Sequence, residues 1–194
     1  MSGEAQQKPF IKRLASADYV EGVWRNGKGK SWEIAQQPDK SGDRFFWRLA
    51  LARISQSTAF SHYDNVDRFI TLIDGPGFTL SVDGRESHNM DMRFTPHGFP
   101  GDAETSCGVH SGVSRVLNLF VARGRYDVRL DVLQEGQHRI GDKNGNCLVF
   151  VLDGQCAVDG LALACQDTAV IQGQSAGLMV PRGGIAYVAV LLPA

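Results

Sequence analysis

The sequence predicts an all-β protein built from two jelly-roll barrels in one chain, and three observations lead to this prediction. Short runs rich in Val, Ile, Leu, Phe and Thr recur roughly every 8–12 residues, separated by Gly, Asp and Asn. Helical periodicity is poor along the whole chain. One arrangement of strands and turns also occurs twice.

The strand-like runs follow one another from residue 45 to residue 192. They are Phe45–Ile54, Arg68–Ile73, Phe78–Gly84, Val116–Ala122, Cys147–Gly154 and Ala186–Leu192. Asn26-Gly27 is a strong signal for a two-residue hairpin turn ahead of them. The one short helix that we predict covers Ala15–Gly22, where Ser16 can cap the first turn.

The repeated arrangement occurs first at Phe69–Gly84 and again at Leu148–Gly160. Each copy reads as an apolar strand, Asp-Gly, a short strand and Val-Asp-Gly, and Asp-Gly favours tight hairpin turns. We therefore predict duplicated barrels with a boundary near residues 123–126: residues 1–124 form a barrel with a ligand pocket, and residues 125–194 form a structural barrel. A chance match of Asp-Gly turns is the alternative.

Composition and charge exclude several classes of function. The 194 residues include 20 basic and 21 acidic side chains, which gives no electrostatic reason to expect nucleic-acid binding. No apolar run approaches the roughly 18–20 residues of a membrane span, and the N-terminus lacks the apolar segment of a signal peptide. The four cysteines form no Cys-x-x-Cys pair, which is typical of reduced thiols in the cytoplasm. We expect a cytoplasmic protein that binds neither nucleic acid nor membrane.

Two arginines occupy unusual strand positions. Arg68 shares strand parity with the apolar Ile70 and Leu72, and Arg48 has the same relation to Ala50. An arginine on an apolar face is either salt-bridged inside the fold or available to an anion. The candidate internal partners are Asp67, Asp102 and Glu33.

The segment Trp24–Ile34 combines aromatic and polar side chains around the expected hairpin. It is not a phosphate-binding P-loop, because the glycine that such a loop needs five residues before Gly29 is replaced by Trp24. Trp24 and Asn26 can instead orient a small polar ligand. A plain hairpin with packed tryptophans is the alternative.

Other catalytic patterns are weak. Gly173–Gly177 matches Gly-x-Ser-x-Gly, but a strand rather than a helix follows it, so Ser175 is not expected to be a nucleophile. None of the five histidines forms a His-x-His pair. Ser61 and His62 point to opposite faces of a strand, which argues against a catalytic triad there.

Several short motifs resemble the HutD/Ves family of histidine-utilisation proteins when they are taken in order. They are WRNGKGKSWEI at Trp24–Ile34, Trp47-Arg48, FSHY at Phe60–Tyr63, DRFITLIDGPG at Asp67–Gly77, FPGD at Phe99–Asp102 and LNLF at Leu117–Phe120. The resemblance implies a doubled cupin fold, or bicupin, a bacterial cytosolic protein and a link to histidine catabolism. Lys28 and Ser31 depart from the glycines and threonine that are usual in this family.

The general cupin pattern places metal ligands at two histidines and one glutamate. In this sequence Ser61, Tyr63 and Arg68 occupy those places. Hydroxyl groups bind soft divalent metals poorly, and arginine cannot ligate them. We therefore predict a site without a metal or another cofactor.

These observations predict a binding protein for a small carboxylate, with a regulatory or sensing role. The resemblance to the HutD/Ves family implies that this carboxylate is a metabolite of histidine catabolism, of the urocanate or formyl- or formimino-glutamate type. The predicted site residues are Arg68, Arg48, Ser61, Tyr63, Asn26, Trp24, Trp47 and Asp102. The arginines would grip the carboxylate, hydroxyl and amide groups would donate hydrogen bonds, and a tryptophan would form an apolar wall. The alternative is a metal-independent isomerase or hydrolase in which Tyr63 or Asp102 acts as acid or base. A homodimer paired through edge strands is possible.

Overall fold

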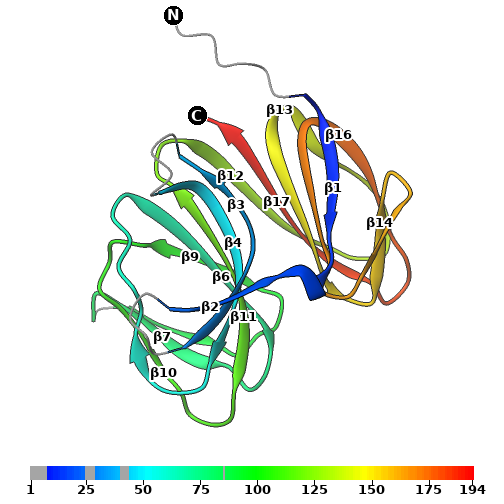
Figure 1. The fold of residues 1–194 in the computed structure, drawn as a ribbon. Helices are drawn as coiled ribbons and strands as arrows, with labels where there is room; N and C mark the ends of the chain where they lie inside the picture. The colour runs from blue at the N-terminus through cyan, green and yellow to red at the C-terminus, as the bar shows by residue number, and fades with distance from the viewer. Residues whose placement is uncertain (1–7, 25–28, 40–43, 85) are drawn as a thin grey trace, which may run out of the picture. The chain divides into compact units, whose positions relative to one another are not determined.

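The computed structural model describes residues 8–24, 29–39, 44–84 and 86–194, and these residues confirm an all-β protein. They form antiparallel strands, with one short 3₁₀ turn, Ser16–Asp18, as the helical element within those ranges (Figure 1). The chain divides into two compact units. Tyr19–Arg125 forms one unit, and Met1–Asp18 together with Tyr126–Ala194 forms the other.

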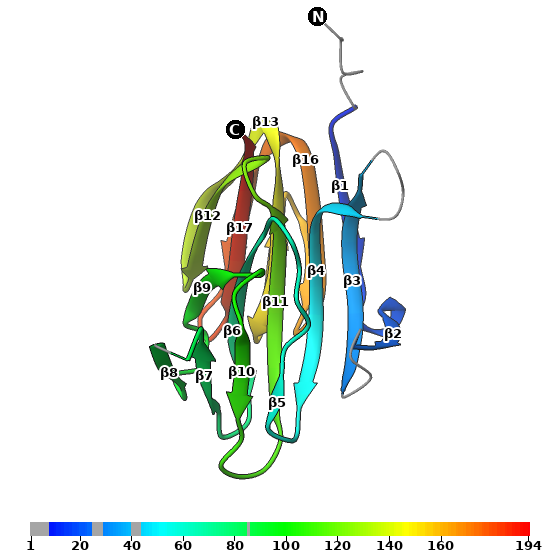
Figure 2. The same ribbon diagram turned by 90° about the vertical axis from the view of Figure 1, so that its left-hand side faces the viewer.

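The unit formed by Tyr19–Arg125 contains two antiparallel sheets. The six-stranded sheet has the order β2 (Val20–Val23), β3 (Lys30–Pro38), β4 (Phe45–Ile54), β11 (Ser114–Ala122), β6 (Val66–Asp74) and β9 (Pro96–Pro100). The four-stranded sheet has the order β5 (Thr58–Ala59), β10 (Thr105–Gly108), β7 (Phe78–Val82) and β8 (Glu86–Met90). Figure 2 shows β3, β4 and β11 running side by side. One apolar cluster joins the inner faces of the two sheets, with Ile70, Leu72 and Leu80 fully buried.

The other unit is a seven-stranded sheet. Six strands follow the order β12 (Tyr126–Leu133), β17 (Ile185–Pro193), β13 (Gly136–Asp153), β16 (Thr168–Val180), β14 (Gln155–Val158) and β15 (Leu161–Ala164). The seventh, β1 (Phe10–Leu14), pairs with β16. A cluster of apolar side chains, rich in valine, fills its core. The period-2 pattern of the long strands places these side chains on one face.

The N-terminal strand corrects the predicted division at residue 124. Strand β1 pairs antiparallel with β16, from Phe10 opposite Gln172 to Leu14 opposite Thr168. The buried carboxylate of Asp167 fixes this strand, because Oδ2 lies 2.7 Å from Nη2 of Arg13. Residues up to Asp18 therefore belong to the second unit and not to the first.

The predicted helix at Ala15–Gly22 is also wrong. Residues 16–18 form a single 3₁₀ turn, and Val20–Val23 form strand β2, which pairs with β3 from Val20 opposite Glu33 to Val23 opposite Lys30. Tertiary pairing here overrides the local capping signal. Asn26-Gly27, the expected hairpin turn between β2 and β3, lies outside the described residues.

The two Val-Asp-Gly segments form hairpin turns, as their sequence predicts. Asp83 and Gly84 have φ angles of 51° and 61°, and Asp159 and Gly160 have φ angles of 46° and 82°. Two successive positive φ values are typical of the type I′ turn, and the pairing of Val158 with Leu161 leaves Asp159-Gly160 as such a two-residue loop, whereas the pairing of Val82 with Glu86 leaves a longer one. These turns connect β7 to β8 and β14 to β15. Duplication of a whole barrel stays a prediction.

Candidate functional site

The register of the six-stranded sheet brings the two predicted arginines onto one row. Phe120 on β11 lies opposite Arg48 on β4 and opposite Arg68 on β6. Directly opposed residues in a sheet point to the same face, so the phenyl ring stands between the two guanidinium groups. The Phe120 centroid is 5.8 Å from Cζ of Arg48 and 4.8 Å from Cζ of Arg68.

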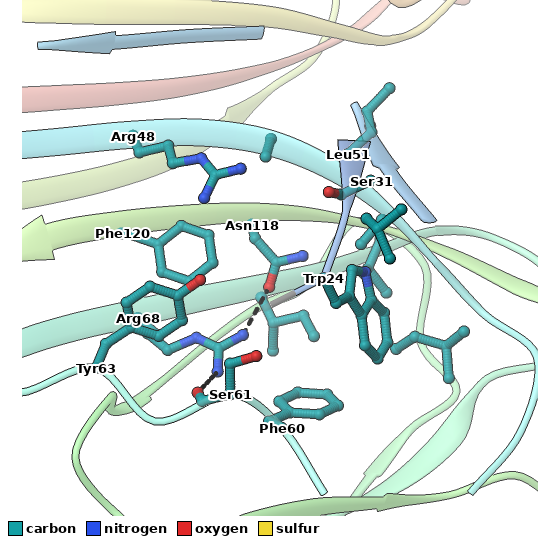
Figure 3. Close-up of a pocket in the computed structure, with 16 residues that line it drawn as sticks. Trp24, Ser31, Arg48, Leu51, Phe60, Ser61, Tyr63, Arg68, Asn118 and Phe120 are labelled. Atoms are coloured by element: carbon teal, nitrogen blue, oxygen red, sulfur yellow. Dashed lines mark hydrogen bonds between the residues drawn. The ribbon is translucent and has the colours of Figure 1, made fainter. Parts of the chain in front are cut away.

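Arg68 is a buried cation with weak hydrogen bonds. The residue is 6% exposed. Nη1 donates to the backbone oxygen of Ser61 and Nη2 donates to Oδ1 of Asn118, each at 3.4 Å (Figure 3). Its buried Nε has no hydrogen-bond partner among the described residues. Burial lowers the pKa of Arg68 to about 10, so the group stays charged at neutral pH while its charge is poorly compensated.

Aromatic rings surround this guanidinium group. Their centroids lie 4.8–5.7 Å from Cζ of Arg68 and belong to Phe60, Tyr63, Phe99 and Phe120. Contacts of this kind attract a cation through the ring quadrupole. They replace only part of the hydration that burial removes, because no ring carries a formal negative charge.

The acidic residues near Arg68 pair with a different arginine. Arg123 donates from Nε to Asp67 at 2.9 Å, and from Nη1 and Nη2 to the two oxygens of Asp102 at 2.8 and 2.9 Å. Within the described part of the chain, no carboxylate forms an ion pair with Arg68. Asp67 and Asp102, considered above as internal partners of Arg68, therefore do not have that role.

Arg48 has a carboxylate beside it. Its Nε lies 3.1 Å from Oε2 of Glu33, and both side chains are partly exposed. The contact does not have the direction of a hydrogen bond, because this Nε has no hydrogen-bond partner among the residues that the structure describes. Of the two arginines, Arg68 is therefore the one that has no counter-charge in the described part of the chain.

A pocket of about 80 Å³ opens beside this row. An engineered apolar cavity of about 150 Å³ holds benzene, so the volume is suitable for the functional end of a small molecule. Sixteen residues line the pocket: Val23, Trp24, Ser31, Arg48, Ala50, Leu51, Ala52, Ile54, Phe60, Ser61, Tyr63, Arg68, Ile70, Val116, Asn118 and Phe120. Figure 3 shows the arginines on one side of the pocket and Trp24 on the other.

The polarity of the pocket changes along the sheet in step with the register. The row of Arg48, Phe120 and Arg68 is followed by Ala50, Asn118 and Ile70, and then by Ser31, Ala52 and Val116. Charge is thus concentrated at one end, an amide lies in the middle, and the far end is largely apolar. The small side chains of the two alanines leave the space that the pocket occupies.

Close backbone contacts position the residues that lie over the sheet. The Tyr63 N–H donates to the Gly101 oxygen at 2.9 Å, which fixes the segment before β6. The Trp24 Nε1–H donates to the Lys30 oxygen at 3.1 Å. A Cβ at Gly29 would lie 2.7 Å from the Trp24 indole, so only glycine lets the ring adopt this position.

The structure brings most of the predicted site residues together, but not all of them. Arg68, Arg48, Ser61, Tyr63 and Trp24 line the pocket, whereas Asn26 lies outside the described residues. Trp47 does not line it: it precedes Arg48, so its side chain leaves the opposite face of β4, where Nε1 donates to Oε1 of Gln37 at 2.8 Å.

Asp102 is the second predicted residue that does not line the pocket. Its carboxylate pairs with Arg123, and this hydrogen bond lowers the pKa of Asp102 to about 2. A carboxylate held in this way is a poor acid or base near neutral pH. The assignment of Asp102 to the ligand site is therefore corrected.

Eleven of the sixteen lining residues are not among the predicted site residues, and those of them with polar or aromatic side chains are Ser31, Phe60, Asn118 and Phe120. Asn118 and Phe120 share strand parity within an apolar run, which marks Asn118 as a polar group on an inner face. That pattern could have pointed to Asn118. The partners of these residues depend on β11 lying between β4 and β6, and strand order is not apparent from local sequence.

Among the described residues there is no group of three or more His, Cys, Asp or Glu side chains that could hold a metal ion. Ser61, Tyr63 and Arg68, which replace the usual cupin ligands, lie together in the pocket. This donor set does not suit a soft divalent metal. Metal-free function stays a prediction. Within the same residues, no helix is long and apolar enough to span a bilayer.

Comparison with solved structures defines the class of fold. A cupin barrel domain protein from Leptotrichia buccalis aligns over 97% of this chain and all of its own, with a TM-score of 0.59 and 12% identity. At that identity the likeness concerns the fold alone. The protein is thus an all-β protein of cupin-like fold, and its first unit carries an arginine-lined pocket.

The particular family follows from sequence. The HutD family model matches residues 16–187, so the chain belongs to the HutD family, as the motifs above indicated. An uncharacterised 21.2 kDa protein from the hutC 3′ region of Pseudomonas putida is 32% identical over 76% of this chain and 77% of its own.

Two further relatives extend the same relation. Protein Ves of Citrobacter koseri is 30% identical over 85% of this chain and 86% of its own. The solved structure of HutD from Pseudomonas fluorescens SBW25, described as a formate condition, covers 95% of this chain and 100% of its own. That comparison has a TM-score of 0.84 and 29% identity.

Proposed function

We propose that the protein binds a small carboxylate metabolite of histidine catabolism in the pocket beside Arg68 and has a regulatory or sensing role in the bacterial cytoplasm. The observation that carries the proposal is the buried guanidinium of Arg68, which lacks a carboxylate partner among the described residues. A buried charge without a counter-charge is costly. An anionic ligand that enters the pocket removes this cost.

The energies suit a reversible metabolite sensor. A hydrogen bond to a charged group contributes roughly 1.5–3 kcal/mol. Two such bonds from Arg68 to one carboxylate correspond to a dissociation constant on the order of millimolar. Burial of the rest of the ligand against Trp24 and Phe60 would strengthen binding further.

The family relation supports the choice of ligand class. The relatives carry the names HutD and hutC 3′ region, which connect them with histidine utilisation. Urocanate and formyl- or formimino-glutamate are carboxylates of that catabolism and are the candidates. In this proposal the site works without a metal, and the two units are duplicated cupin barrels of which the second is structural.

The test is calorimetric titration of urocanate, formylglutamate and acetate, with the uncharged acetamide as the comparison ligand. We expect the wild type to bind at least one acid and not the amide. Arg68→Ala should abolish binding, and Arg68→Lys should weaken it because lysine loses the planar pair of donors. Arg53→Ala is the matched control, since Arg53 lies exposed on the same sheet with strand parity opposite to that of Arg48.

Equal binding by wild type and Arg68→Ala would remove Arg68 from the site and overturn the proposal. The isomerase or hydrolase alternative retains Tyr63, whose ring lies 5.7 Å from Cζ of Arg68, as its acid or base. Product formation during incubation of the same acids with purified protein, lost in Tyr63→Phe, would establish that alternative. Binding without turnover would establish the binding protein.

A further inference from the structure

A cluster of surface charges lies next to the loops that surround Arg68. Arg123, one residue beyond the end of β11, joins Asp67 at the start of β6 to Asp102 in the turn after β9. The Arg123 backbone N–H also donates to the oxygen of Asn65 at 2.8 Å. We call Arg123, Asp67 and Asp102 the surface clasp.

Backbone contacts connect the clasp to the inside of the pocket. Gly101, the residue before Asp102, donates from its N–H to the Val66 oxygen at 2.7 Å and accepts from the Tyr63 N–H at 2.9 Å. The turn that carries Asp102 is therefore bonded both to β6 and to the segment that carries Ser61 and Tyr63. Movement of this turn would move those pocket residues with it.

The same turn contacts the side chain of Arg68. A Cβ at Gly101 would lie 3.3 Å from Cδ of Arg68 and 2.7 Å from the Val66 oxygen. Two residues earlier, Phe99 lies opposite Arg68 in the β6–β9 register, with its ring centroid 4.9 Å from Cζ. The turn thus packs against the aliphatic stem of the arginine, and the strand before it covers the guanidinium group.

The hydrogen bonds of Arg68 itself are too long to fix its position. Both measure 3.4 Å, and its Nε has no partner among the described residues. The bonds of the clasp are short, at 2.8–2.9 Å, and two of them form a bidentate pair. The geometry that a ligand meets at Arg68 is therefore determined by neighbouring segments that the clasp joins.

We propose that the surface clasp is a positioning device: Asp102 and Arg123 hold the segment Phe99–Asp102, which is the end of β9 and the turn after it, against Arg68, so that the guanidinium group of Arg68 is placed for an anion. This inference rests on the proposed function, because it concerns the affinity of the same pocket. It gives Asp102 a role outside the pocket, where it touches no ligand. It also gives three residues of the segment a common purpose: Phe99 covers the guanidinium group, Gly101 lies beside the aliphatic stem of Arg68, and Asp102 anchors the segment to Arg123.

The test measures affinity and stability separately. Calorimetric titration uses the acid that wild type binds most tightly among urocanate, formylglutamate and acetate, at 25 °C and pH 7. Thermal unfolding is followed in parallel. Asp102→Asn and Arg123→Lys should each raise the dissociation constant by roughly tenfold, as loss of an outer-shell partner does at metal sites. The unfolding midpoint should fall by no more than about 4 °C, because exposed ion pairs stabilise little.

Arg93→Gln is the matched control for a general loss of stability. Arg93 lies in the same unit, and its Nε donates to the Ile73 oxygen at 2.9 Å, away from the turn that carries Asp102. Its replacement should lower the unfolding midpoint without changing the dissociation constant. In an Arg68→Lys background, Asp102→Asn should have little additional effect on affinity, because the group that the clasp positions is already altered.

Unchanged affinity in Asp102→Asn and Arg123→Lys, with a wild type that binds the acid, would overturn this inference and leave the proposed function standing. Loss of folded structure in both variants would assign the clasp a purely structural role and would also overturn it. Absence of acid binding in the wild type would instead overturn the proposed function, and the positioning role with it.

Discussion

Each unit contains a buried charge, and the two charges are treated differently. Asp167 in the second unit is 3% exposed and is fully engaged: Arg13 reaches it through Nε and Nη2, and the N–H groups of Ser16 and Ala164 donate to it at 3.1 and 3.0 Å. Arg68 in the first unit is almost as buried, but it has two long hydrogen bonds. A satisfied buried charge holds a structure together, whereas an unsatisfied one is available to a ligand.

The cores of the two units differ in how many polar side chains they contain. The core cluster of the second unit consists of aliphatic side chains and cysteines, among them Val149, Ile171 and Val188. In the first unit, the inner face carries two arginines, an asparagine and two alanines beside an apolar cluster, and a pocket remains. Similar antiparallel strands thus give a filled core or a binding site according to the residues on one face.

The largest expected effect concerns the satisfied charge. Asp167→Ala should lower the free energy of unfolding by roughly 3 kcal/mol, since the N–H groups of Ser16 and Ala164 lose their acceptor at about 1–3 kcal/mol each, and it should loosen β1. Urea denaturation measures the loss. Acid affinity should stay unchanged, because Asp167 belongs to the unit without the pocket. A loss below about 1 kcal/mol would contradict its role as an anchor.

The opposite result is expected for the unsatisfied charge. Arg68→Met should raise the free energy of unfolding by about 1–2 kcal/mol, because it replaces an uncompensated buried cation by an apolar side chain. Acid binding should disappear. Denaturation and titration of the same preparation test both parts, and a strongly destabilised variant would show that Arg68 has a structural role.

A smaller effect is expected for Trp47, which does not line the pocket. Trp47→Phe should lower the free energy of unfolding by about 1 kcal/mol, through loss of the hydrogen bond to Gln37 and of some packing. The dissociation constant for the acid should not change. A higher dissociation constant for the acid would show that Trp47 contributes to ligand binding.

The smallest expected effect is the acid response of the clasp. The folded-state pKa of Asp102 is about 2, below its ordinary value of 3.8, because Arg123 donates to the ionised carboxylate. Its contribution to stability is therefore complete above about pH 4 and is lost as the pH falls toward 2. The midpoint temperature of thermal unfolding should fall less steeply between pH 5 and pH 2 in Asp102→Asn than in wild type. Parallel curves would show that Asp102 has no part in this response.

Local patterns were sufficient for much of the fold. Hydrophobic runs and Asp-Gly turns gave the all-β class and the hairpins at Asp83-Gly84 and Asp159-Gly160. They missed β1, because Phe10–Leu14 is only five residues long, is interrupted by Lys12 and Arg13, and becomes a strand by pairing with β16. The same dependence on distant pairing explains why Val20–Val23 is a strand and not part of a helix.

Strand parity could predict which side chains of the site point to the inner face of the sheet, but not which strands lie next to each other. Parity with Ile70 placed Arg68 on the inner face, and the same argument placed Arg48 there. It could not show that Phe120 separates the two arginines, because that depends on the order of β4, β11 and β6. Nor could parity show that Arg123 pairs with Asp67 and Asp102. Which arginine lies beside these carboxylates depends on the register of the sheet, and the local sequence does not give that register.

The pairing of β1 with β16 also determines the order in which the protein can be completed during synthesis. Arg13 and Asp167 are 154 residues apart in the chain. At translation rates of about 5–20 residues per second, β1 therefore waits on the order of 8–30 s for its neighbour β16. During that interval its edge is open to other chains, and the adjacent charged side chains of Lys12 and Arg13 keep it a poor template for aggregation.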